Sequence, residues 1–295
     1  MKLEDFYLEY KDIIGEPQEI NGIPFYPIKL FEKEKSDILY TLFGRDKMEF
    51  IDEQEMPFEG VKNCYKGSYI KAMLYGYGYK NINNYYGILG LLQKYFEDVC
   101  KIDCVNTEDG VAVLCNNDVK NPLDIFKSPI YIIIKKGNNI LKVDEDMFDV
   151  IRQCVLRQNG ISLKGIEGYK KDLEQLKIEN SKSNKSVSFS DEIFAFIAMS
   201  GLDVNSESFK NYTLYQFKYH FGYLQQYIDY KTLYPLQASG MVKFQNKIKY
   251  YLEPLNFEKG RYDDLLIKAD DFAQSGIAKS VGAFEIPDLK NKQGG

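Results

Sequence analysis

The sequence contains no tryptophan, a single histidine and only five cysteines among its 295 residues. Disulfide scaffolds carry a denser set of cysteines, and structural zinc sites need four Cys or His ligands at characteristic spacings. Cys100 and Cys104 form one close pair, but the sequence has no second pair, and His220 lies far from the first. These shortages argue against a disulfide framework, and we predict reduced thiols and no metal site.

Motifs of nucleotide-binding and hydrolytic enzymes are also missing. The sequence has no Gly-Lys-Ser or Gly-Lys-Thr phosphate loop, and Gly76-Tyr77-Gly78 lacks the third glycine of a dinucleotide loop because that position is Asn81. Without a Gly-x-Ser-x-Gly motif, a catalytic triad would have to use His220, which lies among aromatic residues. We therefore predict no catalytic residues and no cofactor.

Charge of one sign is not concentrated anywhere in the sequence. There are 38 basic and 43 acidic residues, giving a net charge of −5, and no basic block that would contact a phosphate backbone. No apolar run approaches the length of a membrane-spanning helix, and residues 1–5 are acidic where a secretory signal is basic. We expect a soluble cytoplasmic protein with no nucleic-acid or membrane partner.

Apolar and aromatic residues are plentiful. Hydrophobic residues make up 44% of the chain, which is enough for one large domain or two ordinary ones with cores. The 24 tyrosines and 19 phenylalanines suit cores and protein interfaces alike, because tyrosine combines a large apolar ring with a polar hydroxyl. The aromatic content is therefore a first indication of protein binding.

Residues 1–163 predict an α+β domain with short strands and a β-hairpin packed on helices. Asn21-Gly22 indicates a tight turn within a strand pair over residues 20–30. Two β-branched runs, residues 130–134 and 140–143, predict the hairpin. Asp144 then caps a helix, with further acids in its first turn, that ends at Asn159-Gly160.

Other elements of this domain are predicted from local signals. They are a helix from Ser36 to Gly44, an irregular stretch over residues 57–67, helices from Ser68 and over residues 88–99, and a strand over residues 111–114.

The composition changes over residues 164–189, which predict a linker, or a charged helix followed by a loop. A mainly α-helical domain follows at residues 190–256. The capping-box spacing of Ser188 and Asp191 predicts a helix over residues 193–199. A polar C-terminal segment, residues 257–295, completes the chain, and we expect its end to be a mobile tail.

A second capping box, Thr213 to Gln216, predicts a long helix that ends near Leu233. At helical spacing this segment has two apolar stripes on nearly opposite faces. The first contains Leu214, Phe217, Phe221, Leu224 and Ile228, and the second contains Tyr215, Tyr219, Tyr223, Tyr227, Tyr230 and Tyr234.

Two apolar faces imply two contacts, because an ordinary surface helix has only one such face. The helix is either packed between neighbours of the same chain, or it has one core face and one tyrosine face that binds another chain. Under the second interpretation the candidate protein-binding residues are Tyr215, Tyr219, Tyr223, Tyr227 and Tyr230.

Three stretches of the sequence resemble tail-morphogenesis proteins, some of them tail assembly chaperone-like, from phages and prophages of low-GC Gram-positive bacteria. The stretches are the Ile-Pro-Phe-Tyr-Pro-Ile-Lys-Leu run at residues 23–30, residues 131–160, and the Asn-Tyr-Thr-Leu-Tyr-Gln-Phe run at residues 211–217. The resemblance implies no chemistry and carries over no functional residue. It implies binding to another phage protein, such as the apolar helices of a tape-measure protein.

The first hypothesis is therefore a non-enzymatic, chaperone-like phage tail assembly factor in the host cytoplasm. Its partners would be other phage structural or assembly proteins, or a second copy of the chain. The alternative is a structural virion component, such as a baseplate or connector protein, which would be found in the virion. An enzyme of unrecognised type is the third hypothesis.

The linker assignment predicts where proteases cut. Limited proteolysis of the native chain should cleave first within residues 182–188, because loosely packed backbone opens most readily. Timed digestion followed by mass spectrometry of the fragments would identify the first cut. A first cut inside the helix over residues 214–233 would contradict the assignment.

Overall fold

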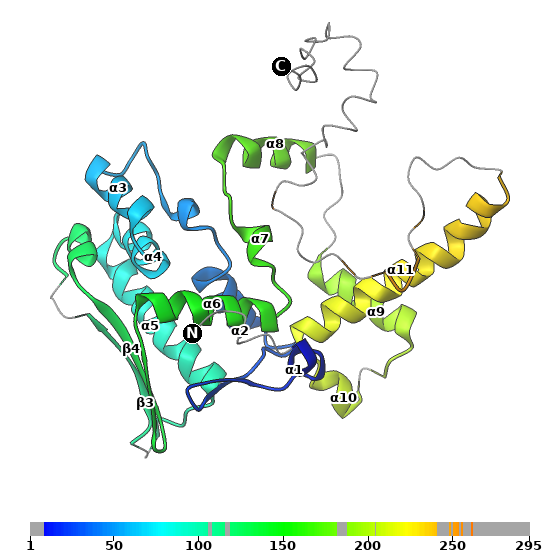
Figure 1. Ribbon diagram of the computed structural model, residues 1–295, viewed down its shortest axis with the longest axis horizontal. Helices are drawn as coiled ribbons and strands as arrows, with labels where there is room; N and C mark the ends of the chain where they lie inside the picture. The colour runs from blue at the N-terminus through cyan, green and yellow to red at the C-terminus, as the bar shows by residue number, and fades with distance from the viewer. Residues whose placement is uncertain are drawn as a thin grey trace, which may run out of the picture.

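The computed structural model describes residues 9–105, 108–115, 119–181, 188–203 and 205–240, together with residues 248, 250–253, 255 and 261. Over these residues the fold is α+β, with two small sheets and packed helices followed by a mainly helical part, as the sequence predicts. Figure 1 shows the larger sheet at one end of the molecule and the last long helix extending from the other.

The described elements follow one another in this order. The first part contains α1 (Glu9–Ile14), β1 (Gln18–Ile20), β2 (Ile23–Phe25), α2 (Lys33–Leu42), η2 (Lys47–Phe50), α3 (Phe58–Lys66), α4 (Tyr69–Gly78), α5 (Ile82–Cys100), β3 (Gly110–Cys115), η3 (Pro122–Lys127), β4 (Ile130–Lys136), β5 (Asn139–Val143) and α6 (Glu145–Gln158). The second contains α7 (Leu163–Ile166), α8 (Lys171–Ser181), α9 (Phe189–Ser200), α10 (Glu207–Lys210) and α11 (Leu214–Ala238).

Both predicted hairpins are confirmed. Strands β1 and β2 pair antiparallel around Asn21 and Gly22, which both adopt positive φ (48° and 77°), the combination that a type I′ turn requires. Strands β3, β4 and β5 form an antiparallel sheet in that order, with Ile132 opposite Val143. Alternate residues of β4 are buried, so one face of the sheet packs on the core.

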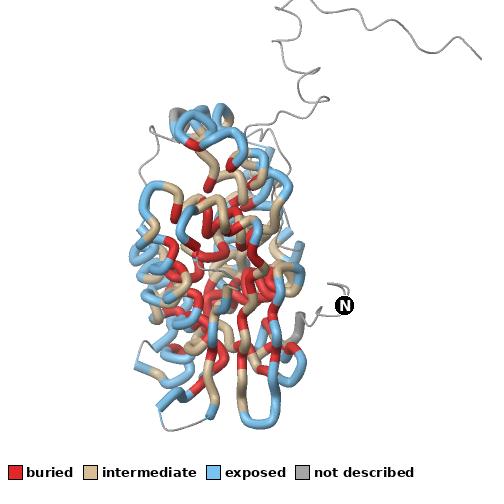
Figure 2. Tube along the Cα trace, turned by 90° about the vertical axis from the view of Figure 1, so that its left-hand side faces the viewer, coloured by how far each residue is buried: buried red, intermediate tan, exposed pale blue. Residues whose placement is uncertain are grey.

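The core of the first part is aromatic. Phe43 stacks on Phe148 with ring centroids 5.5 Å apart, and it also meets Tyr95 and Phe96 at 5.0 and 6.3 Å. Phe96 in turn contacts Phe25 of β2 edge-on. Helices α2, α5 and α6 therefore share one set of rings. Figure 2 shows the buried parts of the chain gathered in the interior of the molecule.

A buried arginine connects α6 to the loop after α2. The Arg152 guanidinium donates to the carbonyl oxygens of Phe43 and Arg45 at 3.0 and 2.7 Å, and it lies 3.9 Å from the ring centroid of Tyr69. Its charge is met by Glu167 at 3.9 Å. Burial of a charge is tolerated here because carbonyl oxygens and a ring face replace water around the guanidinium.

Two predicted helix starts and one predicted loop are wrong. Helix α2 begins at Lys33, not at Ser36. The Glu32 carboxylate stabilises the turn before it, because it accepts from the Lys29 backbone N–H and from the Lys35 ammonium. Helix α5 begins at Ile82, not at residue 88, because Asn81 caps it through the Asn83 backbone N–H.

The stretch over residues 57–67, predicted to be irregular, contains α3. Gly60 lies inside that helix. A Cβ on Gly60 would come within 1.9 Å of the Tyr75 hydroxyl, so glycine is required there for close helix packing. The glycine therefore allows a tight contact with α4 and does not break the helix.

The second part confirms both predicted capping boxes, at Ser188–Asp191 and Thr213–Gln216. Helix α9 ends at Gly201, which has a positive φ of 67°, and α11 extends to Ala238, past the predicted end near Leu233. In the stretch predicted as a linker or charged helix, α8 reaches Ser181, and residues 182–187 lie outside the described residues. The predicted tail likewise lies outside them, apart from Arg261 of its segment.

Arg261 connects the end of the described chain to the first part. Its guanidinium meets the carboxylates of Glu49 and Glu174 at 2.5 and 3.0 Å, and it donates to the Ile166 carbonyl oxygen at 2.8 Å. Two segments far apart in the sequence, one at Glu49 and one over residues 166–174, therefore share one cation.

A short backbone pairing joins the two parts. The Leu30 N–H donates to the Tyr212 carbonyl at 2.7 Å, and the Leu214 N–H donates to the Ile28 carbonyl at 3.1 Å, on either side of an isolated antiparallel bridge. The Ile28 N–H in turn donates to the side chain of Asn159, at the end of α6, at 2.9 Å. These contacts bring β2, α6 and α11 together at one place, which we call the junction.

Lys218 of α11 strengthens the junction from the other side. Its ammonium donates to the carbonyl oxygens of Asn159 and Gly160, where the carbonyls at the end of α6 lack helical partners. Burial lowers the pKa of Lys218 to about 8, because desolvation disfavours the charged form. The cation therefore closes α6 at its negative end while positioning α11.

Replacement of Asn159 tests the junction. Asn159→Ala should lower the free energy of unfolding by about 1–3 kcal/mol, because the buried Ile28 N–H would lose its acceptor. Asn84→Ala, at an exposed helical position, is the control and should change it by about 0.5 kcal/mol or less. Urea unfolding would measure both values, and equal effects would contradict the assigned role of Asn159.

Candidate protein-binding surface on α11

Helix α11 is about 37 Å long, as its 25 residues imply at 1.5 Å per residue. Its capping box is complete, because the Thr213 side chain accepts from the Gln216 N–H and the Gln216 side chain accepts from the Thr213 N–H. Figure 1 shows α9 crossing the first half of α11, while the second half extends away from the body. Only the first half is therefore packed on both sides.

The first apolar stripe faces the core, as predicted. Leu214 and Phe217 are buried, and Phe221 and Leu224 pack against the core at its edge. Phe196 of α9 holds this stripe through edge-on contacts with the rings of Phe217 and Phe221, at 5.4 and 6.1 Å. Packing weakens toward the end of the stripe, where Ile228 is 36% exposed.

The tyrosine stripe is divided by the fold. Tyr215 is buried, and its ring stacks on that of half-buried Tyr219 at 4.2 Å. The Tyr215 backbone lies against Gly160 at the end of α6. Of the five candidate residues, Tyr215 is thus covered by its own chain, because the junction places the first turn of α11 against the first part.

Tyr223 and Tyr227 lie further along and are exposed, by 37% and 40%. They are one helical turn apart on the same face, where i and i+4 side chains are neighbours. Both lie on the half of α11 that leaves the body, where the ring of Tyr251 meets that of Tyr227 edge-on at 5.5 Å. These two candidates are placed where another chain could reach them.

Tyr230 is half-buried by aromatic neighbours. Its ring stacks on that of Tyr234 at 4.8 Å and meets the rings of Tyr250 and Tyr251, both at 5.4 Å. The Gln226 side chain donates to the carbonyl oxygens of Tyr250 and Glu253 at 2.6 and 3.1 Å. Residues 250–253 thus cover the far end of the tyrosine stripe.

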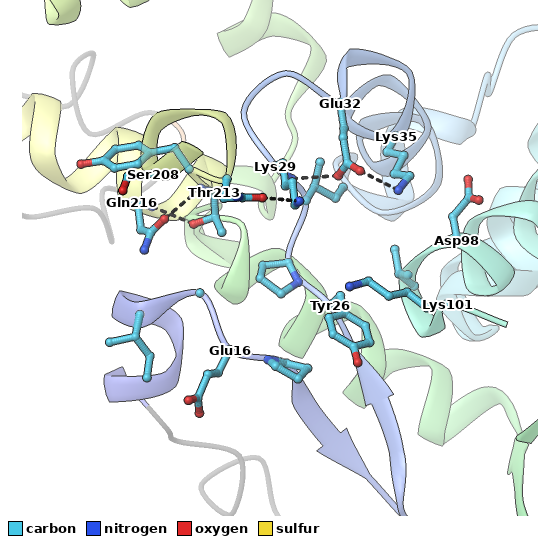
Figure 3. Close-up of a pocket in the computed structure, with 18 residues that line it drawn as sticks. Glu16, Tyr26, Lys29, Glu32, Lys35, Asp98, Lys101, Ser208, Thr213 and Gln216 are labelled. Carbon is cyan, nitrogen blue, oxygen red and sulfur yellow. Dashed lines mark hydrogen bonds and ion pairs between the residues drawn. The ribbon is translucent and has the colours of Figure 1, made fainter. Parts of the chain in front are cut away.

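A cavity of about 500 Å³ lies beside the junction (Figure 3). Its cations have partners: Lys29 donates to Asn211 at 2.6 Å, Lys35 pairs with Glu32 at 2.8 Å, and Lys101 lies 3.7 Å from the ring centroid of Tyr26. Glu16, Glu32 and Asp98 also line the cavity and match its three lysines in number, so it has no net charge to attract a strongly charged ligand.

The other residues singled out in the sequence have structural surroundings. The Tyr212 hydroxyl hydrogen-bonds to Nδ1 of His220, and burial lowers the pKa of His220. Gly76 lies within α4, where a Cβ would come within 2.6 Å of Phe50. Asp144 accepts from the Met147 N–H and so caps α6. Each contact accounts for its residue without a ligand.

Two other kinds of site are absent from the described residues. No group of three or more His, Cys, Asp and Glu side chains there is placed to hold a metal ion. Within the same residues, no helix is both long and apolar enough to cross a bilayer.

Sequence reasoning missed the exposed apolar side chains of α9. Phe194 and Met199 are 69% and 40% exposed, although the sequence predicted only an apolar helix. The signal was present in the composition, because residues 193–199 are apolar on every side and a surface helix of that kind cannot bury all of them.

The two ends of the tyrosine stripe should respond differently to truncation. Tyr215→Ala should lower the free energy of unfolding by about 3–5 kcal/mol, as removal of a buried ring does. Tyr223→Ala should lower it by about 1 kcal/mol or less, because the side chain is exposed. Chemical denaturation of both variants would show the difference, and a large loss for Tyr223→Ala would place it in the core.

Comparison with known proteins bears on this same region. No curated protein and no solved structure matches the chain. Residues 180–256, roughly a quarter of the chain, match the family model described as the YomV second domain. The matched residues include α9, α10 and α11. This part of the chain is similar to the YomV second domain, and the similarity points to a phage-type protein.

Proposed function

We propose that the chain is a non-enzymatic, chaperone-like phage tail assembly factor that binds another phage protein through the extended half of α11. The observation that carries the proposal is the exposure of Tyr223 and Tyr227 on a helix that leaves the body of the molecule. That helix lies within the region similar to the YomV second domain. The tape-measure protein, suggested by the resemblance of three sequence stretches, is the first candidate partner.

The chemistry of the surface favours a protein over a small molecule. Tyrosine is enriched in protein interfaces, where its ring loses contact with water and its hydroxyl reaches the polar rim. Two adjacent rings on a convex helix form no enclosing cavity, whereas small ligands need concave sites. A flat or grooved surface of another chain is the complementary shape.

The contacts of His220 support a role without catalysis. General base catalysis needs a nucleophile within hydrogen-bond reach of the base and a third group that orients it. Nδ1 of His220 is hydrogen-bonded to the phenol of Tyr212, which has a raised pKa because it is partly desolvated. A phenol with a raised pKa is a poor nucleophile at neutral pH, so this pair is better suited to fixing the start of α11.

The three stretches that resemble tail proteins lie close together in the fold. Residues 23–30, the end of the stretch over residues 131–160, and residues 211–217 meet at the junction. The three stretches therefore contain residues that position α11, and the extended half of α11 carries the exposed tyrosines.

Capture of the partner tests the proposal. Tagged full-length chain, purified from host cells during phage production, should retain a phage tail protein that mass spectrometry identifies. The double variant Tyr223→Ala/Tyr227→Ala should retain at least about tenfold less, because truncation of an interface aromatic costs about 2 kcal/mol or more of binding.

Tyr86→Ala is the matched control, because Tyr86 is 55% exposed on α5, remote in sequence from α11. It should retain the partner fully, and all variants should melt close to the wild type. Equal retention by the double variant would contradict the proposed surface. Stoichiometric amounts of the chain in purified particles would show a virion component instead of an assembly factor.

A further inference from the structure

A groove of about 460 Å³ runs between α9 and α11, on the face of α11 opposite Tyr223 and Tyr227. Its floor is apolar and includes Met199 of α9 and Phe221 and Ile228 of α11. The lining positions recur at helical spacing on both helices, residues 191, 192, 195 and 199 on one and 221, 225, 228 and 229 on the other. Two turns of each helix therefore line the groove.

The rim of the groove is acidic. Asp191, Glu192 and Asp229 line it, and no lysine or arginine is among the described residues that do so. Hydrogen bonds from the Ser188 hydroxyl and backbone N–H lower the pKa of Asp191, so this carboxylate is charged at neutral pH. The groove thus combines an apolar floor with a negative rim.

The walls decide which backbone conformation can enter. Both are helices, whose backbone groups are bonded within each helix, so they offer no free strand edge. An extended peptide would leave its own N–H and C=O groups without partners, whereas a helix satisfies them internally. The stretch from residue 191 to residue 199 is about 12 Å long, which matches two turns of a bound helix.

We propose that the groove between α9 and α11 is a docking site for an amphipathic helix with basic flanks, contributed by a partner protein. Two or three apolar side chains of that helix would contact Met199, Phe221 and Ile228. Lysines or arginines beside them would face Asp191, Glu192 and Asp229. The inference rests on the proposed function only in that the ligand is a protein, and it concerns a different face of α11.

Charge argues against two other occupants. Residues 262–295 of the same chain carry six acidic and four basic residues, so that segment shares the sign of the rim. A second copy of the chain has a net charge of −5 and is also of the same sign overall. Like charges placed together weaken binding, whereas a basic helix complements the groove.

The test uses model peptides of about 18 residues, long enough to form a helix on binding. The first has leucines at helical spacing with lysines on both flanks. The second has glutamates in place of the lysines, and the third is a scramble of the first with the same charge and no apolar face. Fluorescence anisotropy with the full-length chain should give a Kd for the first peptide at least about tenfold lower than for either control.

Single substitutions then locate the site. Asp229→Lys and Met199→Glu should each raise the Kd of the basic peptide at least about tenfold. Their matched controls are Glu59→Lys, an exposed acid on α3, and Phe58→Glu, a side chain that is 82% exposed. Both controls should leave the Kd within about twofold, and both groove positions are exposed enough that the fold should tolerate them.

Several outcomes would overturn the inference. Equal binding of the scramble would show that an apolar helix face is not needed. Tighter binding of the acidic peptide would show that the acidic rim does not select basic flanks. Tighter binding of a synthetic peptide of residues 262–295 would identify the chain's own segment as the occupant. Self-association that Met199→Glu abolishes would identify a second copy. Because Tyr223 and Tyr227 are on the opposite face, capture of the tail protein could persist when the peptide test fails, and the reverse could also occur.

Discussion

The fold depends on two backbone hydrogen bonds and one asparagine. Residues 28–30 pair with residues 212–214, and Asn159 holds the Ile28 N–H from the end of α6. Two side chains add to this pairing: Lys218 joins α11 to the end of α6, and Gln158 of α6 donates to the Phe25 carbonyl of β2. The remaining contacts among these elements are apolar, and apolar contacts are not directional. Backbone hydrogen bonds between buried partners are directional, so they fix the position from which the rest of α11 extends. The tyrosine surface and the groove are both on α11, so that pairing determines where each of them lies.

Local signals in the sequence were sufficient for many elements. The Asn21-Gly22 turn, the hairpin around Gly137, and both capping boxes act within a few residues, and the structure has each of them. Helix α3 was missed, and one contact that its packing depends on, the close approach of Gly60 to Tyr75, involves another helix. The junction was equally beyond prediction, because an extended strand such as residues 28–30 does not show in its own sequence which segment it will pair with.

The candidate surface could be predicted in part. Helical spacing was enough to identify a second aromatic stripe on α11, but not to show that the junction covers Tyr215 or that residues 250–253 cover Tyr230. Periodicity describes one helix at a time, whereas exposure depends on what the rest of the chain places against it. The groove was missed for the same reason, since its two walls are about thirty residues apart in the sequence and become neighbours only when α9 packs on α11.

The ion pairs of Arg261 have a consequence for the order of assembly during synthesis. Glu174 and Arg261 are 87 residues apart, and α9, α10 and α11 all lie between them. A ribosome releases Glu49 and Glu174 before Arg261, so these ion pairs form only after α9, α10 and α11 have been synthesised. The guanidinium then closes a loop whose ends are held by charge instead of a covalent bond. A chain that ends before residue 261 would lose the contacts of Arg261 with Glu49, Ile166 and Glu174, and with them the closure of that loop.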